Sequence, residues 1–163
     1  MSERVIVVAD SGPLIALSRI GQLELLPQLF GRVQIPSAVF REVTQGAAEG
    51  RSGAAEVRAA PWIDVVSADE ATSAAYALLV DEGEAEAIAV ARARDALLII
   101  DDDRGRRLAL RLGLRIKGTL GILVLAKHRG LLSRVRPLIE GLPQRGIYVS
   151  QRLIDAVLRD VDE

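Results

Sequence analysis

Short apolar runs alternate with longer helical patterns along the chain. The run at 4–9 (RVIVVA) is rich in β-branched residues and has no polar alternation, which is typical of a strand buried on both faces. The run at 97–100 (LLII) predicts a second central strand of the same kind. Shorter runs predict further strands at 32–35, 63–66, 114–117 and, as an edge strand, at 147–149.

Helical patterns fill the intervals between these strands. Capping residues, prolines and apolar spacing predict helices over 22–30, 37–45, 67–80, 81–94, 118–129 and 131–142. Three more helices are expected, one that begins after Asp10, one that follows the aspartates at 101–103 and ends at Leu112, and one that begins after Ser150. The stretch 47–60 is small, polar and Gly-containing, and we predict a mobile excursion there. The alternation indicates a three-layer α/β/α sandwich around a mainly parallel sheet, formed by a single domain over 1–163.

Composition narrows the classes of site that the chain can carry. It has no cysteine, which excludes disulfides, thiolate zinc sites and cysteine nucleophiles and makes a reducing cytoplasm the expected location. The formal net charge of -1 and the pI of about 5.9 differ from the strongly basic balance of proteins that coat duplexes. No apolar stretch reaches the roughly 20 residues that a membrane span needs, so no membrane partner is expected.

Acidic residues follow the two strands that are predicted to be central. Asp10 ends the first strand, and Asp101, Asp102 and Asp103 end the run at 97–100. Because ligands of parallel α/β sheets lie beyond the carboxyl ends of the strands, we expect these aspartates to meet at one edge. The alternative role of Asp10 is a helix N-cap, and either neighbouring arginines or a metal ion would relieve repulsion within the aspartate run.

Two glutamates lie on helix faces that are predicted to pack inward. Glu84 shares a face with Ile88 and Ala91, which directs its carboxylate toward the edge of the sheet. Its alternative role is a capping box with Asp81, in which Glu84 folds back on the chain. Glu42 lies near an apolar stripe and is either a member of the acidic group or a boundary residue.

Grouped carboxylates of this kind suit a hard divalent cation. Mg²⁺ and Mn²⁺ prefer oxygen ligands in octahedral geometry, and three or four carboxylates with waters supply them without histidine or cysteine. One or two such ions can activate water and neutralise the charge on a phosphodiester. The sequence therefore predicts a site that cuts a phosphodiester bond with Mg²⁺ or Mn²⁺.

The acidic motifs together resemble those of the PIN-domain family over nearly the whole chain. The stretches that carry the resemblance are VVADSGPLIAL, VFREV, DEGEAEAIAVA and LLIIDDDRGRRLA, and the series GEAEAIA, LLIIDD and GTLGILVLAK is similar to a PIN-like branch of predicted nucleic-acid-binding proteins. The resemblance implies catalytic and metal-binding roles for Asp10, Glu42, Glu84 and Asp102, with Asp101 as a competing or additional ligand. The family carries aspartate at the position of Glu84, so Glu82 and Glu86 are alternatives to it.

The resemblance also implies an architecture and an activity. The strand order is expected to be 3-2-1-4-5, and the activity that of a Mg²⁺- or Mn²⁺-dependent endoribonuclease acting on single-stranded RNA. Members of the family often serve as the toxin of a VapC-type toxin–antitoxin pair. A homodimer whose acidic groove is covered by an antitoxin protein is therefore the implied assembly.

Polar residues beside the aspartates are candidates for contact with substrate. Arg104, Arg106 and Arg107 either hold substrate phosphate or pair with the aspartates. Ser11 either contacts phosphate or a metal-bound water, or caps the helix that follows. We take Ser11, Arg104 and Arg107 as the candidate substrate-binding residues. His128, the only histidine, lies far from the acidic motifs in sequence and is assigned no chemistry.

Other enzyme classes lack their defining motifs in this sequence. There is no G-x-G-x-x-G, no G-x-x-x-x-G-K-[ST] and no G-x-S-x-G. A receiver domain would carry its pair of aspartates near the first strand, whereas the aspartate run here comes late in the chain. The remaining alternative is a catalytically silent PIN-like module that acts by binding protein or nucleic-acid partners.

Overall fold

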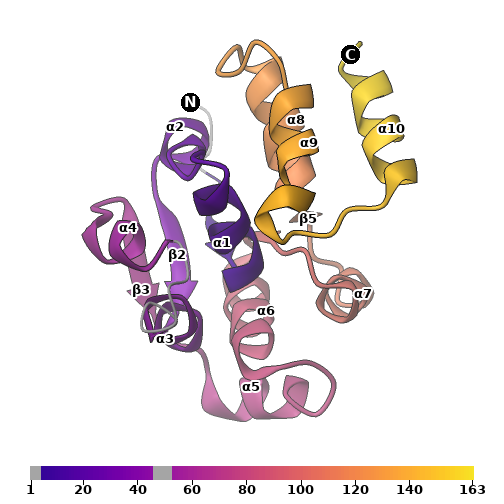
Figure 1. Cartoon of the computed structure of the whole chain (residues 1–163). Helices are drawn as coiled ribbons and strands as arrows, with labels where there is room; N and C mark the ends of the chain where they lie inside the picture. The colour runs from indigo at the N-terminus through magenta and orange to yellow at the C-terminus, as the bar shows by residue number, and fades with distance from the viewer. Residues whose placement is uncertain (1–4, 46–52) are drawn as a thin grey trace.

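Five parallel strands form the central sheet of the protein, in the order β3-β2-β1-β4-β5. The computed structural model describes residues 5–45 and 53–163, and Figure 1 shows the sheet with β3 and β2 on the left and β5 on the right. The strands are β1 Val7–Ala9, β2 Val33–Pro36, β3 Ile63–Val66, β4 Leu97–Ile99 and β5 Ile116–Lys117. The predicted parallel sheet and its strand order are confirmed.

Helices cover both faces of the sheet. One hydrophobic core receives side chains from α1 Ser11–Arg19, α2 Leu25–Phe30, α3 Ser37–Gln45, α4 Ala54–Ala59, α8 Thr119–His128, α9 Arg136–Gly141 and α10 Gln151–Asp160. A second core receives side chains from α5 Glu70–Tyr76, α6 Glu82–Arg94 and α7 Asp103–Arg111. A short 3-10 helix, η2 Pro143–Arg145, follows α9. The predicted three-layer α/β/α sandwich is therefore confirmed.

The central strands have no polar positions because each of their faces meets a different core. Ile99 of β4 points into the first core, and its neighbours Leu98 and Ile100 point into the second. All three side chains are fully buried. Burial of a side chain of this size contributes roughly 1.5–3 kcal/mol, so the continuous apolar run is what holds β4 between two helical layers.

The edge strand predicted at 147–149 is wrong, because these residues form no strand. Ile147 and Val149 pack against the first core, and the backbone N–H of Ile147 donates to the carbonyl oxygen of Leu142. Tyr148 between them is 90% exposed. The alternation of apolar and polar residues is real, but the apolar side chains pack on helices instead of joining the sheet.

Three predicted helices are clearly shorter in the structure, and the one expected at 22–30 begins only at Leu25. The helix expected at 131–142 begins only at Arg136, with Pro137 in its first turn, where the missing N–H of proline is tolerated. The helix expected at 67–80 ends at Tyr76, and a turn follows it. Residues 1–4 lie outside the described residues, and so does the first part of the excursion predicted at 47–60, up to residue 52. In the second part of that stretch, Ala54–Ala59 form α4.

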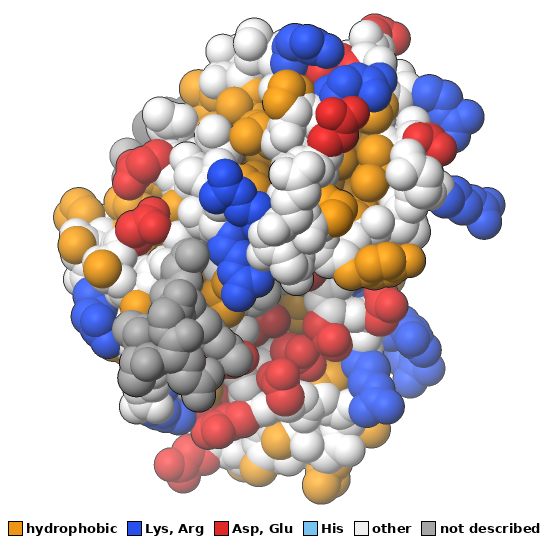
Figure 2. Space-filling view, viewed as in Figure 1, with side chains coloured by type: hydrophobic (Ala, Val, Ile, Leu, Met, Phe, Trp, Pro, Cys, Tyr) orange, Lys and Arg blue, Asp and Glu red, His pale blue; other side chains and the backbone are white. Residues whose placement is uncertain are grey.

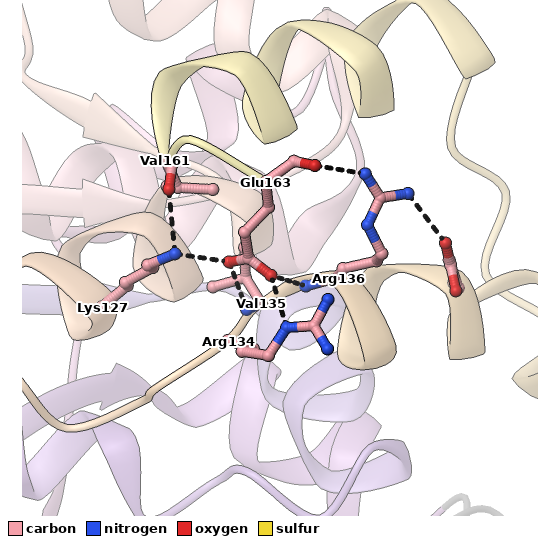
Figure 3. A network of polar contacts seen from close by, with 7 residues as sticks. Lys127, Arg134, Val135, Arg136, Val161 and Glu163 are labelled. Atoms are coloured by element: carbon pink, nitrogen blue, oxygen red, sulfur yellow. Dashed lines mark hydrogen bonds and ion pairs between the residues drawn. The ribbon is translucent and has the colours of Figure 1, made fainter.

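The end of α10 is tied to the body of the protein by the side chain of Glu163 (Figure 3). Its Oε2 accepts hydrogen bonds from Lys127 Nζ at 2.7 Å and from the backbone N–H of Val135 at 2.8 Å. Its Oε1 accepts from the backbone N–H of Arg136 at 3.1 Å, at the start of α9. These donors, Lys127 foremost, lower the pKa of Glu163 to about 2. One carboxylate, three residues beyond the end of α10, thereby contacts α8 and the start of α9.

The helices of the described part of the chain include none that is both long and apolar enough to cross a membrane. The longest, α6, has 13 residues and carries several charged side chains.

Candidate functional site

The carboxyl ends of β1 and β4 place two aspartates at one edge of the sheet. Asp10 follows β1 directly, and its backbone N–H donates to the carbonyl oxygen of Ile99 at 2.9 Å, at the end of β4. Asp102 lies beyond the same end of β4, as the N-cap of α7. The parallel pairing of the two strands therefore brings together residues that are more than 90 positions apart in the chain.

Five carboxylates gather at this edge, and we call them the acidic cluster: Asp10, Glu42, Asp81, Glu84 and Asp102. They come from the β1–α1 junction, from α3, from the start of α6 and from the start of α7. Asp81, Glu42 and Asp102 all raise the pKa of Asp10 by charge repulsion. Figure 2 shows acidic side chains around a hollow in the lower half of this face, with basic side chains at its right-hand rim.

Asp10 is the most deeply buried member of the acidic cluster. It is only 4% exposed, and its Oδ1 accepts no hydrogen bond from the described residues. Burial raises the pKa of Asp10 to about 7, and the neighbouring carboxylates act in the same direction. The backbone N–H of Ser11 acts in the opposite direction. A buried carboxylate oxygen without a hydrogen-bond partner is costly, so the site has an unmet demand for a proton or another positive charge.

Glu84 serves both as a helix cap and as a member of the acidic cluster. Its backbone N–H donates to Asp81 Oδ1 at 2.8 Å, and its Oε2 accepts from the backbone N–H of Asp81 at 3.3 Å. This is the capping box considered as the alternative role. Burial, followed by repulsion from Asp81, Asp102 and Asp10, raises the pKa of Glu84 to about 8. The two roles are thus compatible.

Asp81 was predicted only as a capping residue, although it belongs to the acidic cluster. Its negative charge raises the pKa of both Asp10 and Glu84. The sequence carries one signal for it, because three of the four residues in the stretch DEGE are acidic. The capping pattern explains Asp81 and Glu84 without chemistry, and only the fold shows that Asp10 lies opposite them.

Two glycines allow side chains of other elements to approach the first turns of α6 and α7 closely. A Cβ on Gly83 would lie 2.9 Å from Glu42 Oε2, so the absence of a side chain there admits Glu42 to the start of α6. A Cβ on Gly105 would lie 2.5 Å from Ile100 Cδ1 and 3.7 Å from Glu84 Cδ. Neither glycine stands out in the sequence, since each requirement arises from a different element of the fold.

Adjacent aspartates after β4 point to different places. Asp102 Oδ2 accepts from the backbone N–H of Gly105 at 3.0 Å and lies near enough to Asp10 and Glu84 to raise their pKa values. Asp101 instead caps α8, with Oδ1 accepting from the backbone N–H of Thr119 at 2.7 Å and Oδ2 from its hydroxyl. The geometry therefore favours Asp102 over Asp101 as the fourth acidic group.

The alternatives to Glu84 lie outside the acidic cluster. Glu82 is exposed and forms an ion pair with Arg41, with 3.3 Å between Arg41 Nη2 and Glu82 Oε1. Glu86 accepts a hydrogen bond from the backbone N–H of Ala38 at 3.3 Å. Both side chains are therefore engaged with α3 instead of with Asp10.

The polar residues considered for contact with substrate occupy three kinds of position. Ser11 is buried at the first residue of α1, directly beside Asp10. Arg104 and Arg107 are exposed on α7. Arg106 instead donates from Nη1 to the carbonyl oxygen of Ile100 at 2.9 Å, which makes it part of the scaffold around β4.

The donor chemistry of the acidic cluster suits a hard divalent cation. Each of its side chains offers carboxylate oxygens as metal ligands, and Asp10 Oδ1 has no hydrogen-bond partner among the described residues. As they stand, no three Asp, Glu or His side chains within 5–45 and 53–163 are arranged to hold a metal ion. A cation at the acidic cluster would relieve the repulsion among these carboxylates.

The sequence matches a known protein family. A family model described as a PIN domain matches residues 6–163. No curated protein matches the sequence. Because the matching model spans nearly the whole chain, and because the strand order is the one expected from the resemblance, the chain belongs to the PIN-domain family, whose fold is of the nuclease type.

Proposed function

We propose that the protein is an endoribonuclease that cleaves single-stranded RNA with Mg²⁺ or Mn²⁺ held by the acidic cluster. One observation carries the proposal: Asp10 is buried among four other carboxylates, and its Oδ1 has no partner within the described part of the chain. A protein selected only for stability would replace such a residue by a neutral one. Its presence is explained if the positive charge comes from a ligand.

The residues of the acidic cluster have distinct parts in this proposal. Asp10, Glu84 and Asp102 would hold the cation, and Glu42 would approach it from α3. When bound, the ion stabilises negative charge on the phosphate and activates a water molecule as nucleophile. Asp102 and Asp81 already accept hydrogen bonds from first-turn N–H groups, which fixes their orientation before substrate arrives. Ser11, Arg104 and Arg107 would contact substrate phosphate from the rim.

Cleavage of a labelled single-stranded RNA in Mn²⁺ tests the proposal. We expect cleavage by the unaltered protein, none in chelator, and a loss of at least about a hundredfold in the Asp10→Asn variant, since metal-held water is lost. Asp95→Asn is the matched control, because Asp95 is exposed in a left-handed conformation at the opposite end of α6, where asparagine is well tolerated. Cleavage that survives Asp10→Asn would refute the assignment of the site.

A catalytically silent PIN-like module is the second candidate. The observation in its favour is that no three acidic or histidine side chains within the described ranges are arranged to hold a metal ion as they stand. Calorimetric titration with Mn²⁺ separates the two candidates. If the unaltered protein binds Mn²⁺ and Asp10→Asn does not, the result supports the enzyme. If the unaltered protein neither binds Mn²⁺ nor cleaves RNA, the result supports the silent module.

The biological setting belongs to the same proposal. A VapC-type toxin would slow the growth of its host when expressed alone, and co-expression of its antitoxin would restore growth. Sedimentation of the purified protein tests the proposed homodimer. A purely monomeric protein would remove the dimer from the proposal without affecting the nuclease site.

A further inference from the structure

Beside the acidic cluster lies an open cleft of about 500 Å³. Asp81, Glu84 and Asp102 contribute acidic side chains to its lining, Leu78 and Leu79 contribute apolar ones, and Arg104 contributes a basic one. A smaller hollow of about 150 Å³ shares Leu79 and Arg104 with the cleft and continues along α7 to Arg107 and Arg111. The two hollows therefore form one continuous surface that leads away from the acidic cluster.

The basic side of this surface is a stripe on one face of α7. Arg104, Arg107 and Arg111 are spaced i, i+3 and i+7, which places them on the same side of the helix. All three are exposed, and none forms a hydrogen bond or ion pair with any described residue. The stripe from Arg104 to Arg111 is about 10 Å long, at a rise of 1.5 Å per residue.

The stability of α7 does not explain this stripe. Arg104 is the second residue of the helix, where the positive end of the helix dipole disfavours a cation. Only Arg111, in the last turn, is favourably placed with respect to the dipole. Unpaired arginines beside a nuclease-type site instead suit a ligand with regularly spaced negative charges, because the guanidinium group matches phosphate bidentately.

The apolar side is a turn that displays two leucines. Leu78 is 86% exposed and Leu79 is 59% exposed, while Val80 after them is buried and anchors the turn. Neighbouring exposed leucines on the rim of a polar cleft form a small apolar patch, and apolar patches rimmed by polar residues often mark a contact with a ligand or partner. Leucine is one of the apolar side chains that proteins insert against the faces of nucleic-acid bases.

We propose that Leu78, Leu79, Arg104, Arg107 and Arg111 form a track that holds the backbone and bases of a single-stranded RNA beside the acidic cluster. This α7 track rests on the proposed function for the identity of its ligand, and it extends the substrate contact by Arg111 and the two leucines. In a stacked strand each phosphate advances by about 3.4 Å, so three arginines over about 10 Å match about three phosphates. The arginines grip the backbone on one side, and the leucines support the bases on the other.

Salt-dependent binding measures the contribution of the arginines. Fluorescence anisotropy with a labelled single-stranded RNA is recorded in chelator and in Ca²⁺, over 50 to 200 mM KCl. Replacing Arg104, Arg107 and Arg111 by Gln makes the slope of log affinity against log salt shallower by about 2, at about 0.7 per phosphate contact. Between 50 and 200 mM KCl, the affinity of the unaltered protein for RNA therefore falls about 16-fold more than that of the variant. A control variant removes the same charge from exposed arginines elsewhere, at Arg129, Arg152 and Arg159, and leaves the slope unchanged.

The leucines are tested separately because their contribution does not involve charge. The Leu78→Ser and Leu79→Ser double variant weakens binding but keeps the slope, as expected for an apolar contact. Circular dichroism and thermal melting verify that the variants are folded, which is expected because all the replaced side chains are exposed. A leucine double variant that sediments as a monomer while the unaltered protein sediments as a dimer would overturn the α7 track, since that face would then be a subunit interface.

The outcomes separate the α7 track from the proposed function. Binding with the expected slope change but no cleavage in Mn²⁺ supports the track and removes the nuclease activity. Cleavage by the unaltered protein, with equal slopes for the α7 and control triple variants, overturns the track and leaves the nuclease. Absence of measurable RNA binding by the unaltered protein in both conditions also overturns the track.

Discussion

Replacing Asp10 by asparagine is expected to stabilise the metal-free protein at pH 8. Burial and neighbouring carboxylates raise the pKa of Asp10 from 3.8 to about 7, a difference of about 3 pH units. At 1.36 kcal/mol per unit, the ionised side chain destabilises the folded protein by about 4 kcal/mol above pH 7. Asparagine carries no charge, but its buried amide lacks partners at a cost of about 1–3 kcal/mol, so we expect a net gain of about 1–3 kcal/mol.

The pH dependence gives a sharper test than the net gain. Because the folded pKa is raised, the folded protein binds more protons than the unfolded chain between pH 3.8 and about 7. The destabilisation is therefore absent below pH 3.8, grows as the pH rises through this window, and is complete above pH 7. The cost of burying the unpartnered asparagine amide is the same at every pH. It therefore cancels from the change, between pH 5 and pH 8, in the stability of Asp10→Asn relative to the unaltered protein.

Urea unfolding of both proteins in chelator supplies the measurement. The stability of Asp10→Asn relative to the unaltered protein should increase between pH 5 and pH 8 by about 3 kcal/mol, from about two pH units of titration. Glu84 titrates in both proteins, and the loss of repulsion from Asp10 lowers its pKa in the variant, which acts in the same direction as the expected increase. The Asp95→Asn control should show no such increase, because Asp95 is exposed. A relative stability that is independent of pH, or that decreases with pH, would refute the proposed burial of a charged Asp10.

Three further changes test other parts of the structure. Glu163→Gln should lower the melting temperature at pH 7, and the difference should vanish as the pH falls from 4.5 toward about 2, because a lowered pKa stabilises only above that window. Gly105→Ala should lower the free energy of unfolding by about 1 kcal/mol, because its Cβ would lie 2.5 Å from the side chain of buried Ile100. Gly121→Ala is the control: its Cβ would lie no closer than 3.7 Å to a neighbour, and it should raise the free energy of unfolding by about 0.5–1 kcal/mol because alanine favours a helix. Gly83→Ala should reduce RNA cleavage in Mn²⁺ about ten- to a hundredfold with little change in melting temperature, since its Cβ would lie 2.9 Å from the exposed carboxylate of Glu42 and displace it.

Much of the sheet was predictable because burial on both faces leaves a direct mark on the sequence. The runs at 4–9 and 97–100 contain no polar alternation, and β1 and β4 lie within them in the centre of the sheet. The run at 147–149 shows the limit of this signal. An apolar side chain there gains as much from packing on a helix as from joining a strand, so the pattern alone does not distinguish the two.

That Asp10 and the aspartates after β4 share one edge follows from the sequence, because the carboxyl ends of parallel strands coincide. Which of these aspartates joins the acidic cluster depends on how the helices pack in the folded chain. Asp101 and Asp102 are adjacent and chemically identical, yet one caps α8 and the other caps α7 beside Glu84. The raised pKa of Asp10 was equally beyond the sequence, since it arises from side chains on three other helices that exclude water and place their charges around one carboxylate.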